Sequence, residues 1–289
     1  MRSEQEMMNL IISVAQQDQR IRAAAMNGSR TNVRAPRDPF QDYDIVYLVT
    51  DVRSFVRTPT WIDVFGERVI LQTPEDSVIF PADGSSRYPY LMLFQDGNRV
   101  DLTLLPITER ETYCREDRLT VILLDKDGIM PQLPSPSDLD YQVQRPSAKA
   151  FADCCNEFWW VSTYVAKGLW RQEILYAMDS LRYVRDMLIR MMEWRVGVEQ
   201  HFNVSTGKAG KYLKQYLTEN DWHDLLASYP PAEEETIWES LITMAGLFRR
   251  TSLWVGEQLG FDYNLDEDNQ VTGYLRHIRQ LPRDAKEIF

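Results

Sequence analysis

Four prolines in the middle of the chain separate two stretches whose sequence patterns differ. They fall within sixteen residues, at Pro131, Pro134, Pro136 and Pro146. Proline lacks a backbone N–H and interrupts both helices and sheets, so a cluster of this kind is typical of a boundary between domains. A chain of 289 residues also has the length of about two domains of ~150 residues each. We therefore expect one domain over residues 1–145 and a second over residues 146–289.

Before the prolines, helix and strand patterns alternate. Ser3 and Glu6 form a capping-box pattern at the start of a helix. Residues 43–50 are rich in β-branched and aromatic side chains, which is typical of a buried strand. Asp96-Gly97 is a strong signal for the turn of a β-hairpin. The patterns together predict strands near residues 21–26, 43–50, 68–72, 88–95, 98–105 and 119–125, and helices near residues 3–15, 51–65 and 109–118.

After the prolines, the chain reads almost wholly as helix. Apolar residues recur at helical spacing, as in Leu181, Val184 and Leu188. Such a stripe is more typical of a helix that packs into a core than of a ligand site. The adjacent Cys154 and Cys155 are expected to pack in the same way. Helices are predicted near residues 148–166, 169–195, 208–218, 232–259 and 267–280.

The charge balance narrows the choice of partners. The formal net charge is −11; residues 1–145 carry 16 basic and 22 acidic side chains, and residues 146–289 carry 16 and 21. An evenly acidic surface repels a phosphate backbone, which argues against nucleic acid as the main partner. It suits a cationic small molecule, and the same charge would equally result from a requirement for solubility alone. The three cysteines provide neither a disulfide framework nor a zinc spacing. With no apolar run of ~20 residues and no signal-peptide core, we expect a cytoplasmic protein without a membrane anchor.

The first candidate functional residues lie before and at the start of the strand predicted over residues 43–50. Gly28-Ser29 forms a turn whose backbone N–H groups and hydroxyl can cradle phosphate oxygens. Asp42 and Asp44 alternate with Tyr43, so both carboxylates project to one side of the strand. Two carboxylates this close repel each other unless a cation lies between them. Oxygen ligands of this kind, together with substrate phosphates, are the usual environment of Mg²⁺.

A third carboxylate, that of Asp101, follows the predicted hairpin turn. Its neighbours Val100 and Leu102 would face the core, which leaves Asp101 on the opposite face of the strand. If this strand lies beside the strand of Asp42 and Asp44, three carboxylates converge on one site. Each element is common by itself, but their order and strand context favour a functional site.

The order of these elements resembles the nucleotidyltransferase superfamily related to DNA polymerase β. Longer strings narrow the resemblance to the aminoglycoside 6-adenylyltransferases, the enzymes that inactivate streptomycin. The strings are MNGSRTN, QDYDIVYLV, RVDLTLLP and DKDG in the first half and FWWVSTYVAKGLWRQEILYA in the second. This resemblance spans essentially the whole chain. It implies an α/β (α+β) nucleotidyltransferase domain with a mixed sheet, followed by an all-α helical-bundle domain that binds the second substrate.

The resemblance also implies roles for the residues of the first half. Gly28 and Ser29 would hold the triphosphate of ATP, and Asp42 and Asp44 would bind Mg²⁺. Asp101 would complete the triad as a general base, a metal ligand or both. The implied reaction transfers AMP from ATP to a hydroxyl group of an aminoglycoside, with streptomycin as the expected acceptor, and releases pyrophosphate. Arg30, beside the glycine turn, is a further candidate for contact with phosphate.

A streptomycin-like acceptor carries guanidinium groups, which require carboxylates and aromatic faces. Glu173 and Asp179 are the candidate carboxylates on a helix that we expect to open at Trp170, and Trp170 and Tyr176 are the candidate aromatic contacts. Acidic residues early in a helix also stabilise its dipole, which is the alternative interpretation. Two lysines at the expected start of the helix near residues 208–218 form a basic cluster that would bind ATP phosphates. These are Lys208 and Lys211. The alternative interpretation is a solvated helix end.

Two other classes of function remain open. One is a nucleotidyltransferase that acts on RNA or a protein, which would require a basic groove. The other is a non-catalytic nucleotide-binding or antitoxin-type module, which would be expected to have lost part of the carboxylate set. We expect the protein to be a monomer or a weak dimer.

Overall fold

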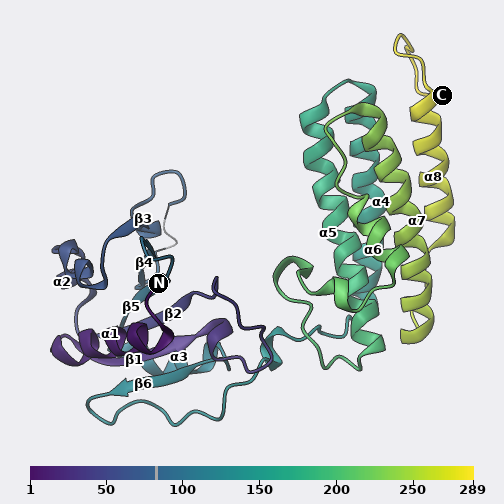
Figure 1. The fold of residues 1–289 in the computed structure, drawn as a ribbon. Coiled ribbons are helices and arrows are strands. Elements are labelled where there is room, and N and C mark those ends of the chain that lie inside the picture. Colours follow the sequence, from purple (N-terminus) through teal and green to yellow (C-terminus); the bar gives the residue numbers. More distant parts are fainter. Residues whose placement is uncertain (82–83) are drawn as a thin grey trace. The chain divides into compact units, whose positions relative to one another are not determined.

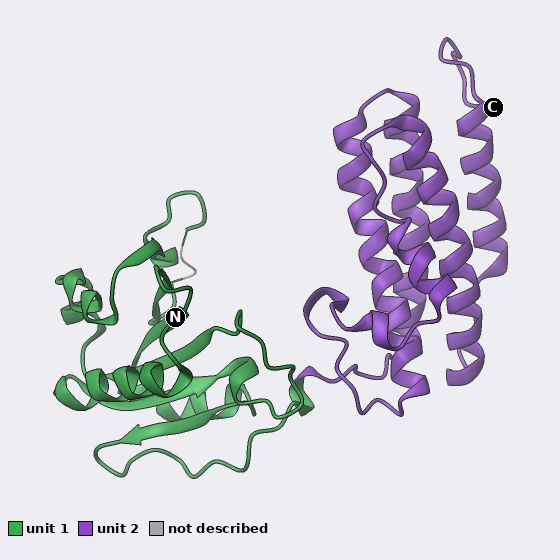
Figure 2. Cartoon of the chain, in the orientation of Figure 1, with its two compact units in different colours: residues 1–140 green, residues 141–289 purple. Residues whose placement is uncertain are grey.

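The computed structural model describes residues 1–81 and 84–289 and divides the chain into two compact units. They are Met1–Asp140 and Tyr141–Phe289 (Figure 2). The division lies within the proline-rich stretch, a few residues before the position at 145 expected from the sequence. Each unit has hydrophobic core clusters of its own.

The first unit is built on a six-stranded mixed sheet with the order β3-β4-β5-β2-β1-β6 (Figure 1). The central strands β2 and β5 are parallel, whereas the other neighbouring pairs are antiparallel. The predicted α/β (α+β) fold with a mixed sheet is therefore confirmed. The strands are β1 Ile21–Asn27, β2 Tyr43–Val49, β3 Arg68–Gln72, β4 Tyr88–Phe94, β5 Arg99–Pro106 and β6 Val121–Asp125.

Helices cover both faces of this sheet. Helix α1 (Glu4–Gln17) begins with the predicted capping box, in which Ser3 and Glu6 each accept a hydrogen bond from the other's backbone N–H. The hydroxyl of Tyr47 on β2 donates to the carbonyl of Ile11, 2.6 Å away, and ties α1 to one face. On the opposite face, Tyr113 of α3 (Arg110–Glu116) belongs to a second core cluster. Strand alternation therefore buries Tyr43, Ile45 and Tyr47 in the α1-side core and directs Asp44 to the α3 side.

The prediction of one helix over residues 51–65 is wrong in its length. Helix α2 covers only Val52–Val56, and a 3₁₀ segment follows over Pro59–Phe65. Pro59 has no N–H to continue an α-helix, and the residue before a proline disfavours the helical conformation.

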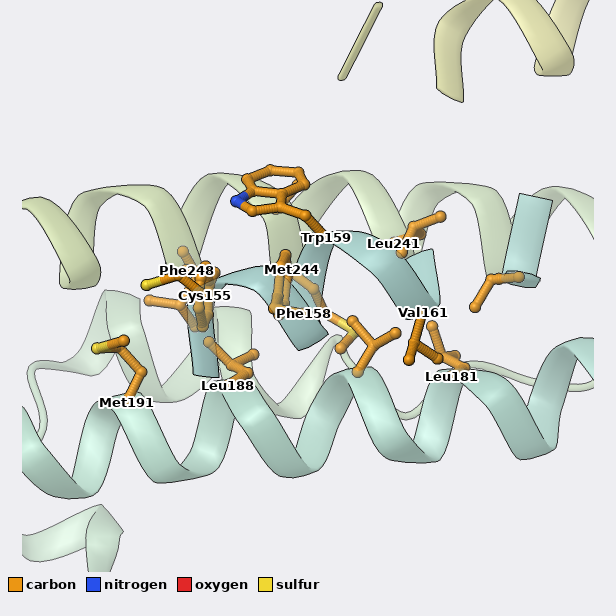
Figure 3. Close-up of a cluster of buried hydrophobic side chains, with 14 of the residues drawn as sticks. Cys155, Phe158, Trp159, Val161, Leu181, Leu188, Met191, Leu241, Met244 and Phe248 are labelled. Carbon is orange, nitrogen blue, oxygen red and sulfur yellow. The ribbon is translucent and has the colours of Figure 1, made fainter. Parts of the chain in front are cut away.

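The second unit is a helical bundle, as expected. Its core is centred on the rings of Phe158 and Phe248, which stack with centroids 3.8 Å apart, while Trp159 meets Phe158 edge-on (Figure 3). Cys154 and Cys155 are buried in the same cluster, and burial raises the pKa of both thiols. The helices are α4 Ala148–Trp170, α5 Ile174–Glu199, α6 Glu219–Leu226, α7 Glu234–Leu259 and α8 Leu265–Gln280.

Two helix boundaries in this unit differ from expectation. Helix α4 continues through Gly168 to Trp170. The glycine allows α5 to pack closely against α4, since a Cβ at this position would lie 3.2 Å from the Cβ of Ala177. The chain then turns at Gln172, whose φ is 62°, and α5 begins at Ile174. The helix expected near residues 208–218 is instead two 3₁₀ turns, Lys208–Gly210 and Leu213–Gln215.

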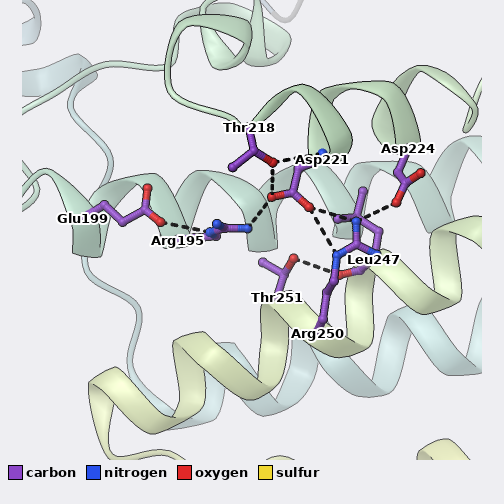
Figure 4. A network of polar contacts seen from close by, with 8 residues as sticks. All are labelled: Arg195, Glu199, Thr218, Asp221, Asp224, Leu247, Arg250 and Thr251. Atoms are coloured by element: carbon purple, nitrogen blue, oxygen red, sulfur yellow. Dashed lines mark hydrogen bonds and ion pairs between the residues drawn. The ribbon is translucent and has the colours of Figure 1, made fainter.

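A buried carboxylate joins three helices of the bundle. Asp221 on α6 accepts hydrogen bonds from Arg195 on α5 and Arg250 on α7, both at 2.8 Å (Figure 4). The hydroxyl of Thr218, the N-cap of α6, also donates to this carboxylate. Charge-assisted hydrogen bonds of this kind satisfy a buried charge, and this network links α5, α6 and α7. Within residues 1–81 and 84–289, none of the helices has the length and apolar character needed to cross a membrane.

Candidate active site

Three carboxylates meet at the centre of the sheet. Asp44 on β2 is the register partner of Asp101 on the parallel strand β5, and Asp42 immediately precedes β2. One carboxylate oxygen from each residue lies within 4.8 Å of those from the other two. We refer to Asp42, Asp44 and Asp101 as the carboxylate triad. The sequence predicts that these residues converge only if their two strands are neighbours. Strands β2 and β5 are neighbours in the sheet, so that condition is met.

The glycine turn lies directly against the triad. Strand β1 ends at Asn27, which pairs with Asp44, and the next residue is Gly28. Gly28 has a φ of 74°, and a Cβ at this position would lie 2.1 Å from Oδ2 of Asp44. Only glycine permits both this conformation and this approach. Ser29 follows in the same 3₁₀ turn, and its hydroxyl accepts a hydrogen bond from the side chain of Gln41.

The triad carries more negative charge than its surroundings neutralise. Burial, together with the nearby charges of Asp42 and Asp101, raises the pKa of Asp44 to about 6. Like charges held this close disfavour ionisation of one another. Carboxylate oxygens are the hard ligands that Mg²⁺ prefers, so the donor set fits a divalent cation of this type.

Arg99 is a residue of this site that the sequence analysis missed. Its Nε lies 2.8 Å from Oδ1 of Asp101 and its Nη2 lies 2.7 Å from Oδ2, a bidentate arrangement. Its Nε is also 3.4 Å from the carboxylate of Asp42. The signal was available, because Arg99 and Asp101 stand two residues apart on one strand, the same spacing that placed Asp42 beside Asp44.

A cleft of about 380 Å³ in the first unit opens beside the triad. Its lining includes Asp44, Asp101, Asn27, Arg87 and Tyr113. The hydroxyl of Tyr113 donates to the side-chain carbonyl of Asn27, whose amide donates to Thr120, 2.7 Å away. This partly buried chain of hydrogen bonds fixes the end of β1 and therefore the start of the Gly28-Ser29 turn.

Arg30 has contacts of a different kind from those expected. Its guanidinium donates to the backbone carbonyls of Asp42 and Gln41, at 2.9 and 2.8 Å, and stacks on the ring of Tyr43. Only 7 % of the side chain is exposed. These contacts hold the segment that leads into β2, and none of them supports the expected contact with phosphate.

The candidate acceptor residues lie in the second unit. Glu173 is the exposed N-cap residue of α5, and Asp179 forms an exposed ion pair with Arg182 at 3.5 Å. Trp170 does not open this helix, as had been expected; it ends α4, and its indole donates to the carbonyl of Leu281. The ring of Tyr176 lies on α5 with the ammonium of Lys167 5.5 Å from its centroid.

Lys208 and Lys211 are also in the second unit and are exposed. They flank a 3₁₀ turn of three residues rather than the start of an α-helix. The helix dipole that was expected to support anion binding there is therefore missing, and the two ammonium groups alone support it.

The sequence of this chain is similar to those of known proteins over almost its whole length. The family model described as streptomycin adenylyltransferase matches residues 1–278. An aminoglycoside 6-adenylyltransferase of Bacillus subtilis (strain 168) is 46 % identical over 280 residues, which cover 96 % of this chain and 98 % of that protein. One from Campylobacter jejuni is 45 % identical over 281 residues, covering 97 % and 96 %.

A crystal structure of an aminoglycoside 6-adenyltransferase from Bacillus subtilis is also similar. It is 41 % identical, and the match covers 97 % of this chain and 100 % of that chain with a TM-score of 0.49. The match to the family model over most of the chain, together with the identity to these relatives, establishes the assignment. The chain belongs to the streptomycin adenylyltransferase family and is an enzyme of the nucleotidyltransferase class.

Proposed function

We propose that this enzyme transfers AMP from ATP to a hydroxyl group of an aminoglycoside, and that streptomycin is its acceptor. The observation that carries the proposal is the carboxylate triad with Gly28 packed against Asp44. An intact triad argues against a non-catalytic module. The relatives' names supply the acceptor class, and the net charge of −11 suits a polycationic substrate better than a nucleic acid.

Asp42, Asp44 and Asp101 would hold Mg²⁺. When bound there, the ion would neutralise phosphate charge and stabilise the attacking and leaving oxygens. Gly28 and Ser29 would receive the triphosphate, since the turn leaves backbone N–H groups close to the triad. Lys208, Lys211 and Arg30 remain proposed contacts of ATP; for Arg30, the bonds to backbone carbonyls make a positioning role the better supported one.

The chain's own contribution to the chemistry is positioning and proton transfer. The acceptor hydroxyl oxygen forms a bond to the α-phosphorus, the bond from that phosphorus to the bridging oxygen breaks, and pyrophosphate leaves. The hydroxyl proton passes to a carboxylate oxygen of Asp101, which lies near the start of β5 beside the cleft. A positioned carboxylate base of this kind contributes about 10²–10⁴-fold.

We expect Asp101→Asn to lower kcat by about 10²–10⁴-fold and to change the affinity for ATP by less than about threefold. The amide cannot accept the proton, but it keeps the size of the side chain. Steady-state kinetics and calorimetric titration with ATP measure the two effects separately. A loss of Mg²⁺-dependent ATP affinity in proportion to kcat would identify Asp101 chiefly as a metal ligand.

On the acceptor side, we propose that Glu173 and Asp179 bind guanidinium groups and that Trp170 and Tyr176 provide aromatic contact. Because both carboxylates are exposed, each of Glu173→Gln and Asp179→Asn should weaken streptomycin binding by about two- to fivefold. ATP affinity should not change. Calorimetric titration with streptomycin and with ATP tests this.

Asp153→Asn is the matched control, since Asp153 forms a similar exposed ion pair with Lys149 on α4. It should leave both affinities unchanged. Streptomycin affinity equal to wild type in both acceptor variants would limit Glu173 and Asp179 to a role at the start of the helix.

The overall activity is tested by pyrophosphate release with ATP, Mg²⁺ and a panel of aminoglycosides, with RNA as a further arm. Release with streptomycin, and a product whose mass has grown by one AMP group, is the expected result. Release that depends on RNA or occurs with no aminoglycoside would reject the proposed acceptor.

We further propose that the enzyme acts in the cytoplasm as a monomer or weak dimer. ATP is available there, and its cysteines, Cys114, Cys154 and Cys155, are free. Light scattering across a concentration series measures the oligomeric state.

A further inference from the structure

The guanidinium of Arg99 lies within the carboxylate triad. Its planar fork engages both oxygens of Asp101, at 2.8 and 2.7 Å, and its Nε is 3.4 Å from Asp42. The oxygens that Arg99 occupies are thus oxygens of the residues proposed to hold Mg²⁺. A guanidinium and a divalent cation that share one carboxylate repel each other, so binding of the cation weakens the contact between Arg99 and Asp101.

We propose that Arg99 is an internal counter-cation of the triad, which offsets part of its negative charge in the metal-free protein and competes with the divalent cation for Asp101. The competition sets the concentration at which the metal binds. This inference rests on the proposed metal site, but it concerns binding of the ion in the absence of either substrate.

The two arginines near the triad differ in how easily they can move. Arg30 has 7 % of its side chain exposed, and its guanidinium donates to two backbone carbonyls. Arg99 has 47 % of its side chain exposed, and its guanidinium pairs with the carboxylates of Asp42 and Asp101. A half-exposed guanidinium returns to water at small cost, whereas a buried one does not. Arg30 is therefore the fixed cation of the site and Arg99 the displaceable one.

The test is binding of Mn²⁺, a spectroscopic substitute for Mg²⁺, to the full-length protein without ATP or aminoglycoside. Free Mn²⁺ is counted by electron paramagnetic resonance. Arg99→Gln should bind Mn²⁺ about three- to tenfold more tightly than wild type, because the competing charge is gone. Arg99→Lys keeps the charge without the fork, so its affinity should lie between the two.

Arg22→Gln is the matched control. Arg22 on β1 pairs with the carboxylate of Asp127, outside the triad, and this variant should bind Mn²⁺ as wild type does. The melting temperature in metal-free buffer provides a second measurement: Arg99→Gln should melt lower than wild type there and gain more on addition of Mn²⁺.

Equal or weaker Mn²⁺ binding by Arg99→Gln would overturn the competition while leaving the metal site intact. If Arg99→Gln does not fold without metal, Arg99→Lys decides: an affinity no higher than wild type overturns the proposal. No Mn²⁺ binding by any of the proteins would overturn the metal site itself, and the competition with it.

Discussion

Replacing Asp44 by asparagine is expected to lower kcat by about 10³-fold and to leave the protein folded. A bound metal ion contributes several kcal/mol of transition-state stabilisation, and about 4 kcal/mol corresponds to roughly 10³ in rate. The amide is a neutral and weaker ligand in the middle of the triad. Pyrophosphate release at saturating ATP and Mg²⁺ measures the loss, and the thermal unfolding profile verifies the fold.

The same variant should be more stable than wild type near neutral pH when metal is absent. Unfolded aspartate has a pKa of about 4, whereas that of Asp44 in the folded protein is about 6. Between these values the folded state binds more protons than the unfolded state, so wild-type stability falls as pH rises. Asp44→Asn is spared this loss. The difference in unfolding free energy should be near zero below pH ~4 and about 2–3 kcal/mol above pH ~6.

Melting temperatures from pH 4 to 8 in buffer with a chelator measure this effect. Asp96→Asn should change the unfolding free energy in the opposite direction, because a hydrogen bond from Arg2 holds the pKa of Asp96 below its usual range. That variant should lose stability at neutral pH. Near-normal activity of Asp44→Asn would mean that Asp44 does not hold a metal, and a pH-independent difference in melting temperature would mean that repulsion in the triad is negligible.

Local patterns were enough to predict the strands that carry the triad. Residues 43–50 are β-branched and aromatic, and Asp96-Gly97 marks the hairpin, so β2, β4 and β5 follow from short-range rules. Short-range rules place β4 beside β5, but they do not say which strand is the second neighbour of β5. The order of the whole sheet decides that this neighbour is β2. The convergence of Asp44 and Asp101 was therefore only a conditional prediction until the sheet order was known.

The errors at Arg30 and at the boundary between α4 and α5 depend on contacts with the backbone or with a neighbouring helix. Arg30 is held by carbonyls of residues 41 and 42, and backbone acceptors leave no trace in a sequence pattern. The helix expected near residues 148–166 continues through Gly168 to Trp170, and α5 packs closely against it at Gly168. The placement of Trp170 and Glu173 on one helix failed for the same reason.

Gly28→Ala is expected to lower kcat by about 10²-fold or more, although it adds a single methyl group. The new Cβ would lie 2.1 Å from Oδ2 of Asp44, a distance at which the carboxylate must move. A displacement of about 1 Å in a catalytic group is enough to cost 10²-fold in rate. The positive φ of 74° adds strain of about 1–2 kcal/mol, which should lower the melting temperature.

Gly128→Ala separates the strain from the contact with Asp44. Gly128 has a φ of 65°, close to that of Gly28, but a Cβ there would meet no atom within 4 Å. This control should therefore lose a similar amount of stability and keep its kcat. Equal losses of kcat in the two variants would assign the effect to backbone strain alone. A loss confined to Gly28→Ala, with weaker Mn²⁺ binding, would show that the glycine is required because it gives Asp44 its position in the triad.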